Sequence, residues 1–128
     1  MNASALMDAH VQLKRVYTAL NEALDLTKQL AEAVDRDDQV TVQMFIAMRQ
    51  EPTDRLAEAQ DALEQQRRSL PVEDSVRLDA LLKGGEPVTP EEAPLAKQVG
   101  LNQRTLKQLV DLDRVVNRKL ARDKSIYR

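Results

Sequence analysis

An apolar residue recurs every seven positions through the first third of the chain, and this repeat constrains the fold more than any other feature of the sequence. One series consists of Leu6, Leu13, Leu20, Thr27 and Val34, and a second, three residues later, of Ala9, Val16, Ala23 and Leu30. This spacing places both series on one face of an α-helix and is typical of coiled-coil-like packing. The sequence therefore predicts a first helix over about residues 5–34, capped at its start by Asn2 or Ser4.

The apolar face of this helix is wider than a two-helix seam requires. Tyr17, Leu24 and Ala31 occupy the next position of the repeat, so the helix can contact more than one neighbour. Only 2% of the residues are aromatic and only three are glycine, which disfavours a β-sandwich or barrel. We therefore expect one all-α domain over residues 1–128, an antiparallel hairpin or bundle of three to four helices with coiled-coil-like packing.

A polar break at residues 35–38 separates the first helix from a second one. Asp37 or Asp38 can cap the second helix, and the short turn predicts an antiparallel hairpin over about residues 5–70. Its repeat is carried by Val42, Phe45, Arg49, Pro52, Leu56, Ala59, Leu63, Gln66 and Leu70. Pro52 interrupts this helix because it lacks a backbone donor, so a kink, a break or a restart is expected there.

Two further helices are predicted after residue 70. Pro71 can open a short helix over about residues 72–83, which ends at Gly84 and Gly85. Residues 89–92 form a capping-box sequence for a last helix over about residues 90–121. Its apolar face is formed by Leu95, Val99, Asn102, Leu106, Leu109, Leu112, Val116 and Leu120. The tail over 122–128 leaves the repeat and is expected to fray.

Charge is distributed unevenly along the chain. Residues 1–94 carry ten Lys and Arg against 18 Asp and Glu, whereas residues 95–128 carry nine against three. The basic last helix either packs against acidic neighbours or docks on an acidic partner. Nucleic acid is not expected as a partner, because no aromatic residue lies among the basic ones to stack on bases.

The sequence offers no set of residues that points to catalysis. There is no cysteine, His10 is the only histidine, and no phosphate-binding loop or metal-ligand spacing is present. We expect a non-enzymatic protein without metal or cofactor. No signal peptide and no apolar stretch of about 18 residues is seen, so a soluble, cytoplasmic protein without membrane insertion is expected.

Two residues of the last third do not fit a plain helical surface. Asn102 lies on the apolar face of the last helix, where a polar residue either bonds to a neighbouring helix or marks a partner site. Tyr127 is an aromatic residue in a charged tail, and tyrosine is favoured at protein interfaces. Both the structural and the binding interpretation remain open for each.

The pattern as a whole resembles the FlgN family of flagellar hook-filament junction export chaperones. The resemblance covers about residues 6–127 and lies in a long first helix followed by Asp37, Asp38, Arg49, Leu56, Leu63, Arg67, Asn102, Leu106 and Tyr127. It implies a cytoplasmic chaperone that holds a flagellar structural subunit before type III export. The implied partners are a flagellar hook-associated protein, as client, and a component of the export gate.

The resemblance also implies sites. The client would contact Leu106, Leu109, Val116 and Leu120 on the last helix, and Tyr127 would dock at the export gate. A monomer or weak homodimer is expected in that case. The alternative is a self-associating coiled-coil adaptor, in which the same apolar faces pack against a second copy and no export role exists.

Overall fold

The computed structural model describes the chain from residue 1 to residue 126, and its side chains as far as residue 122. The elements in order are α1 (Ala3–Asp35), α2 (Gln39–Met48), α3 (Gln50–Ser69), α4 (Val72–Leu82), the 3-10 turn η1 (Pro90–Glu92) and α5 (Ala93–Ile126). No strand occurs in residues 1–126, so the all-α prediction is confirmed. Over the same residues, no helix combines the length and the hydropathy that crossing a membrane requires.

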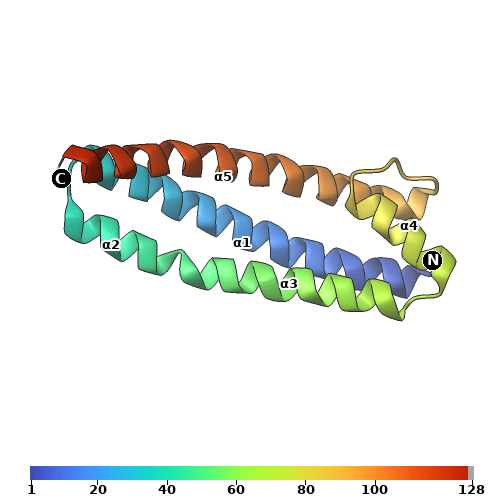
Figure 1. Cartoon of the computed structure of the whole chain (residues 1–128). Helices are drawn as coiled ribbons and strands as arrows, with labels where there is room; N and C mark the ends of the chain where they lie inside the picture. The colour runs from blue at the N-terminus through green and yellow to red at the C-terminus, as the bar shows by residue number, and fades with distance from the viewer. Residues whose placement is uncertain (127–128) are drawn as a thin grey trace.

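The long helix α1 lies in the middle of the bundle (Figure 1). α5 packs along one side of it, and α2 and α3 return along the other side, antiparallel to both. In the described part of the chain, no Cα atom of α2 or α3 lies within 8 Å of a Cα atom of α5. The bundle therefore has two outer arms, α5 on one side and α2 with α3 on the other, which are joined mainly through α1. α4 covers one end of the bundle.

α1 forms as its repeat predicts. All nine residues of the two predicted series are buried, from Leu6 to Val34. Its first turn is capped by Asn2, whose Oδ1 accepts a hydrogen bond from the Ala5 amide at 2.8 Å. Because α1 also buries Leu24, Ala19 and Ala33, its apolar face is wide enough to contact a helix on each side.

The turn after α1 and the break after α2 both follow from local chemistry. Asp38, rather than Asp37, caps α2, with its Oδ1 accepting from the Thr41 amide at 3.1 Å. Helical bonding is interrupted at Arg49, three residues before Pro52. Proline cannot donate to the Met48 carbonyl four residues back, so α2 ends there and α3 restarts with Pro52 in its first turn.

The connection from α4 to α5 is fixed at both ends. Gly84 adopts a φ of +95°, and the amide of Gly85 donates to the Ala80 carbonyl at 2.9 Å, so the glycines end α4 as predicted. The capping box differs from the prediction. The Thr89 side chain makes no capping bond, and the buried Glu92 accepts from the amide of Val88, one residue before the predicted cap, at 2.8 Å.

The prediction of a frayed tail from residue 122 is wrong as far as residue 126. α5 continues to Ile126, five residues beyond the predicted end at Ala121. Arginine and lysine favour helix even where no apolar face is buried, so the loss of the repeat did not end the helix. Residues 127 and 128 lie outside the described part of the chain.

Candidate functional site

Side chains from α1, from α5 and from the α2–α3 arm meet in layers that repeat every seven residues. From one layer to the next, the residue numbers in α1 and α5 increase by seven and those in α2 and α3 decrease by seven, because α2 and α3 run in the opposite direction. The layers are Leu13, Leu63 and Val99; Leu20, Leu56 and Leu106; Thr27, Arg49 and Asp113; and Val34, Val42 and Leu120. Three layers are apolar and one is polar, which we call the polar layer.

An apolar groove of about 390 Å³ lies between α3 and α5, with α1 as its floor. Leu82 of α4 lies at one end of it. Its lining is formed by Leu13, Val16, Leu20, Leu56, Gln60, Leu63, Glu64, Leu82, Val99, Asn102, Gln103 and Leu106. Leu106 is 44% exposed, so part of the apolar lining of the groove remains uncovered.

The groove exists because the bundle has no complete fourth helix. α4 has 11 residues and spans roughly 16 Å, whereas α1 has 33 residues and spans roughly 50 Å. Leu78 and Leu81 of α4 are fully buried and complete the core at one end only. Beyond the end of α4, no element of the described chain fills the space between α3 and α5.

The polar layer lies one repeat beyond the groove. The Arg49 Nη1 donates to Thr27 Oγ1 at 3.3 Å and to Asp113 Oδ1 at 2.7 Å, which joins α1, the α2–α3 junction and α5. Thr27 is fully buried. The seven-residue repeats include Thr27 and Arg49, but the sequence analysis predicts no contact between them. Asp113 was missed, although it lies seven residues after Leu106.

Asn102 of α5 lines the groove and is hydrogen-bonded within the fold. Its Nδ2 donates to the Leu13 carbonyl at 2.9 Å, and its Oδ1 accepts from Gln98 Nε2 at 3.0 Å. Of the two interpretations of this residue, bonding to a neighbouring helix is the one observed. The bond to α1 fixes the register of α5 along the floor of the groove.

The four residues predicted to contact a client lie in different surroundings. Leu106 lines the groove, and Leu109 is half-buried against the same core. Val116 is fully buried with Leu30 and Val42, and Leu120 is half-buried beside it. In this structure a partner can reach Leu106 directly, but it reaches Val116 only if α5 separates from α1. Tyr127, the predicted gate residue, lies outside the described residues.

The basic residues of α5 include one that pairs within the fold and several that are exposed. Lys119 forms an ion pair with Asp35 of α1, so part of the basic helix packs against acidic neighbours. Arg104, Lys107, Arg114 and Arg118 are exposed. These four basic side chains are therefore open to solvent along α5.

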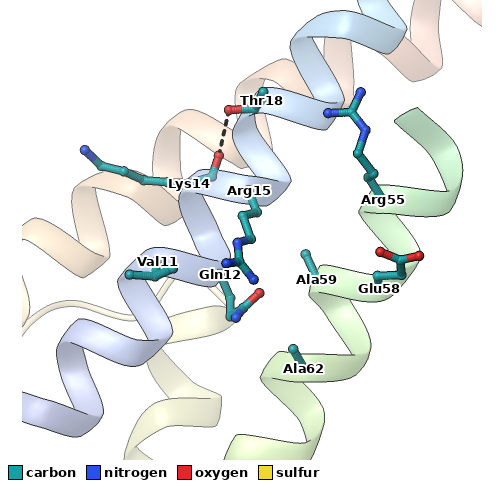
Figure 2. Close-up of a pocket in the computed structure, with 9 residues that line it drawn as sticks. All are labelled: Val11, Gln12, Lys14, Arg15, Thr18, Arg55, Glu58, Ala59 and Ala62. Carbon is teal, nitrogen blue, oxygen red and sulfur yellow. Dashed lines mark hydrogen bonds between the residues drawn. The ribbon is translucent and has the colours of Figure 1, made fainter. Parts of the chain in front are cut away.

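A second recess, of about 600 Å³, lies on the α1–α3 side of the molecule. Figure 2 shows Gln12 and Arg15 of α1 extending toward the short side chains of Ala59 and Ala62 of α3. Arg55, at its edge, is paired with Glu22. Across the described side chains, no three His, Asp or Glu residues lie close enough together to hold a metal ion.

The fold and the groove define a class: an all-α helical bundle in which the short helix α4 covers the space between α3 and α5 at one end and leaves it open beyond. Comparisons with models of known protein families, with curated proteins and with solved structures find no match for this chain. The assignment of function therefore depends on the groove and on the residues around it.

Proposed function

We propose that the protein binds an amphipathic helix of another protein in the groove between α3 and α5, and that it acts as a cytoplasmic chaperone for a flagellar subunit before type III export. The observation that carries this proposal is the open space between α3 and α5 beyond the end of α4, where half-exposed Leu106 lies beside an apolar floor formed by α1. An amphipathic helix that lays its apolar face in such a groove is a common mode of recognition.

The dimensions of the groove suit a short helical segment. The stretch of α5 from Gln103, in the lining of the groove, to Asp113, in the polar layer beyond it, covers ten residues, or roughly 15 Å. A bound helix would cover about three turns over this distance. Burying two or three of its apolar side chains would contribute about 2 kcal/mol each, before the entropy of association is subtracted.

The identity of the client and of the second partner is supported by the family resemblance alone. On that basis the client is a flagellar hook-associated protein, and an export-gate component binds through Tyr127. We expect the Tyr127→Ala variant to keep its melting temperature and client affinity while losing affinity for the gate component. A fall of several degrees in melting temperature with gate binding intact would instead identify Tyr127 as a structural residue.

A calorimetric titration with the terminal segments of flagellar hook-associated proteins tests the proposal. The wild type should bind one of them, and Leu106→Asp should weaken binding by at least about tenfold, because it places a charge in the apolar groove. Val40→Asp is the matched control, since Val40 is 83% exposed on α2 and does not line the groove. Equal weakening by both variants, or no binding of any segment, would exclude this function for the groove.

The alternative of a self-associating adaptor uses the same apolar surface. A second copy would then place one of its own helices in the groove. Sedimentation at rising protein concentration separates the two functions: the chaperone is expected to be a monomer or weak dimer, and the adaptor a tight dimer that Leu106→Asp disperses.

A further inference from the structure

We propose that the outer side of α2, with the recess that it forms beside α1, is a second docking surface. It binds an amphipathic helix of another protein in which lysines or arginines flank the apolar face. No residue of α2 lines the groove between α3 and α5, and α2 lies at the end of the bundle opposite α4 (Figure 1). The two surfaces can therefore be tested independently of each other.

Apolar residues lie on every side of α2, yet the helix is covered on one side only. None of its ten residues is charged, whereas α3, on the same arm, has eight charged residues among 20. Val42 is the one residue of α2 that is buried. A helix that is hydrophobic on all sides is normally enclosed by neighbours. The outer side of α2 therefore has the composition of a packed surface without a neighbour in the described chain.

Three exposed apolar residues form a row along this outer side, which we call the α2 stripe. Val40, Met44 and Met48 follow one another at intervals of four, so they lie on adjacent turns of one side of the helix. They are 83%, 48% and 48% exposed. Single exposed apolar residues are common on protein surfaces. A row on adjacent turns is instead the pattern with which one helix packs against another.

The α2 stripe continues into a recess of about 460 Å³ between α1 and the junction of α2 with α3. The apolar part of its lining is formed by Leu26, Ala47, Met48 and Pro52. Met48 belongs both to the stripe and to the recess, so the two form one apolar surface. From Val40 to Met48 this surface extends over eight residues of α2, or roughly 12 Å, which is about two turns of a partner helix.

The charges of the recess favour a basic partner. Its charged lining residues are Glu22, Asp25 and Glu51. Arg55 pairs with Glu22 and lies 3.8 Å from Glu51, so one guanidinium group is shared between two carboxylates. Asp25 is exposed, and no described Lys or Arg pairs with it. The recess therefore keeps a net negative charge, which attracts a lysine or arginine, and the long stem of either residue can pack on the apolar lining.

The same charges disfavour a second copy of this chain as the occupant. At the other end of the α2 stripe, residues 35–38 include three aspartates, one of them paired with Lys119, against Arg36. Both ends of the stripe are therefore acidic. A two-fold dimer packs the same surface of each copy together, so acids would face acids whether the two α2 helices ran parallel or antiparallel.

Two synthetic peptides of about 18 residues, long enough to form a helix, test this inference. Both carry leucines along one face, and they differ only in having Lys or Gln on the flanks of that face. Calorimetry is carried out with the full-length wild type and with Leu106→Asp, in which the groove is disabled. We expect both proteins to bind the Lys peptide about tenfold more tightly than the Gln peptide at about 0.05 M salt, and less so at about 0.5 M, because salt screens exposed charges.

Apolar substitutions locate the bound peptide. Met44→Gln combined with Met48→Gln should weaken binding of the Lys peptide by about tenfold, because the α2 stripe loses its apolar contacts. Val72→Gln combined with Val76→Gln is the matched control, since these exposed valines have the same spacing on α4. Circular dichroism checks that each variant is folded. Loss of binding in Leu106→Asp but not in the methionine variant would place the peptide in the groove and overturn the inference.

Charge substitutions test the acidic recess. Asp25→Asn combined with Glu51→Gln should reduce the affinity for the Lys peptide to that for the Gln peptide. Glu58→Gln combined with Asp61→Asn changes the net charge equally at exposed positions of α3 outside the recess, and should preserve the difference. Equal effects of the two pairs, or failure of the Lys peptide to bind the wild type, would overturn the inference and leave the groove untouched. Sedimentation that finds a dimer dispersed by the methionine variant would also overturn it, by identifying a second copy as the occupant.

Discussion

Glu92 is an acidic side chain that the fold buries, and its partners hold the start of α5. Arg77 donates to it from Nε at 3.0 Å and from Nη2 at 2.7 Å, and the Val88 amide donates at 2.8 Å. The hydrogen bonds from Arg77 lower the pKa of Glu92 from 4.5 to about 2. The charged form is therefore the one that stabilises the connection between α4 and α5.

Replacing Glu92 by Gln should lower the free energy of unfolding by about 2 kcal/mol at neutral pH, because Arg77 loses its charged partner. The pKa is lower in the folded state, so this contribution is complete above about pH 4.5 and is lost as the pH falls toward 2. Urea unfolding of both proteins across this range measures the difference, which should shrink with acidification.

Glu64 provides the matched control. The hydrogen bond from Arg67 lowers its pKa to about 2 as well, but its side chain is 43% exposed. Water screens such a pair, so Glu64→Gln should change stability less than Glu92→Gln. Equal losses would indicate that burial of Glu92 adds nothing to the effect of its ion pair.

Substitutions at Val116 and Leu106 should differ strongly in their effect on the free energy of unfolding, although both residues lie on the apolar repeat of α5. Val116→Asp should lower the free energy of unfolding by more than about 3 kcal/mol, because it buries an unpaired charge in the core. Leu106→Asp should change it by about 1 kcal/mol or less, since this residue is 44% exposed. Circular dichroism with urea compares them. A folded, stable Val116→Asp protein would mean that α5 opens readily.

At the scale of elements, two glycines on either side of η1 should respond oppositely to alanine. Gly84 ends α4 with a φ of +95°, where a Cβ is strained and would also lie 3.0 Å from Gln103 Nε2, so Gly84→Ala should cost about 1 kcal/mol. Gly100 lies inside α5 with no neighbour within 4 Å of an added Cβ, so Gly100→Ala should stabilise by about as much. Thermal unfolding of both variants measures the signs.

At the scale of the whole molecule, stability should be distributed according to how many helices each element contacts. α1 packs against both arms and buries 13 residues, whereas α2 buries only Val42. Hydrogen exchange should therefore be slowest at the centre of α1, intermediate in α5 and fastest in α2. Binding of a helix in the groove should slow exchange in α3 and α5 near Leu56 and Leu106 and leave α2 little changed.

Local features determined much of the fold in advance. The repeat in α1, the Asp38 cap, the restart of the helix at Pro52 and the glycine stop after α4 each depend on residues within a few turns of one another. Such signals are present in the sequence because hydrogen bonds at helix ends and the side-chain period of a helix are short-range properties. The end of α5 was placed too early because a charged helix needs no apolar face to continue.

Only the tertiary structure decided which apolar faces are covered. A seven-residue repeat shows that Leu106 and Val116 share a face of α5. It does not show that α4 is too short to cover Leu106, or that α2 reaches Val116. The polar layer likewise requires Thr27, Arg49 and Asp113 to meet from three helices. Packing joins residues far apart in the chain, so the groove and the polar layer depend on distances that no single helix contains.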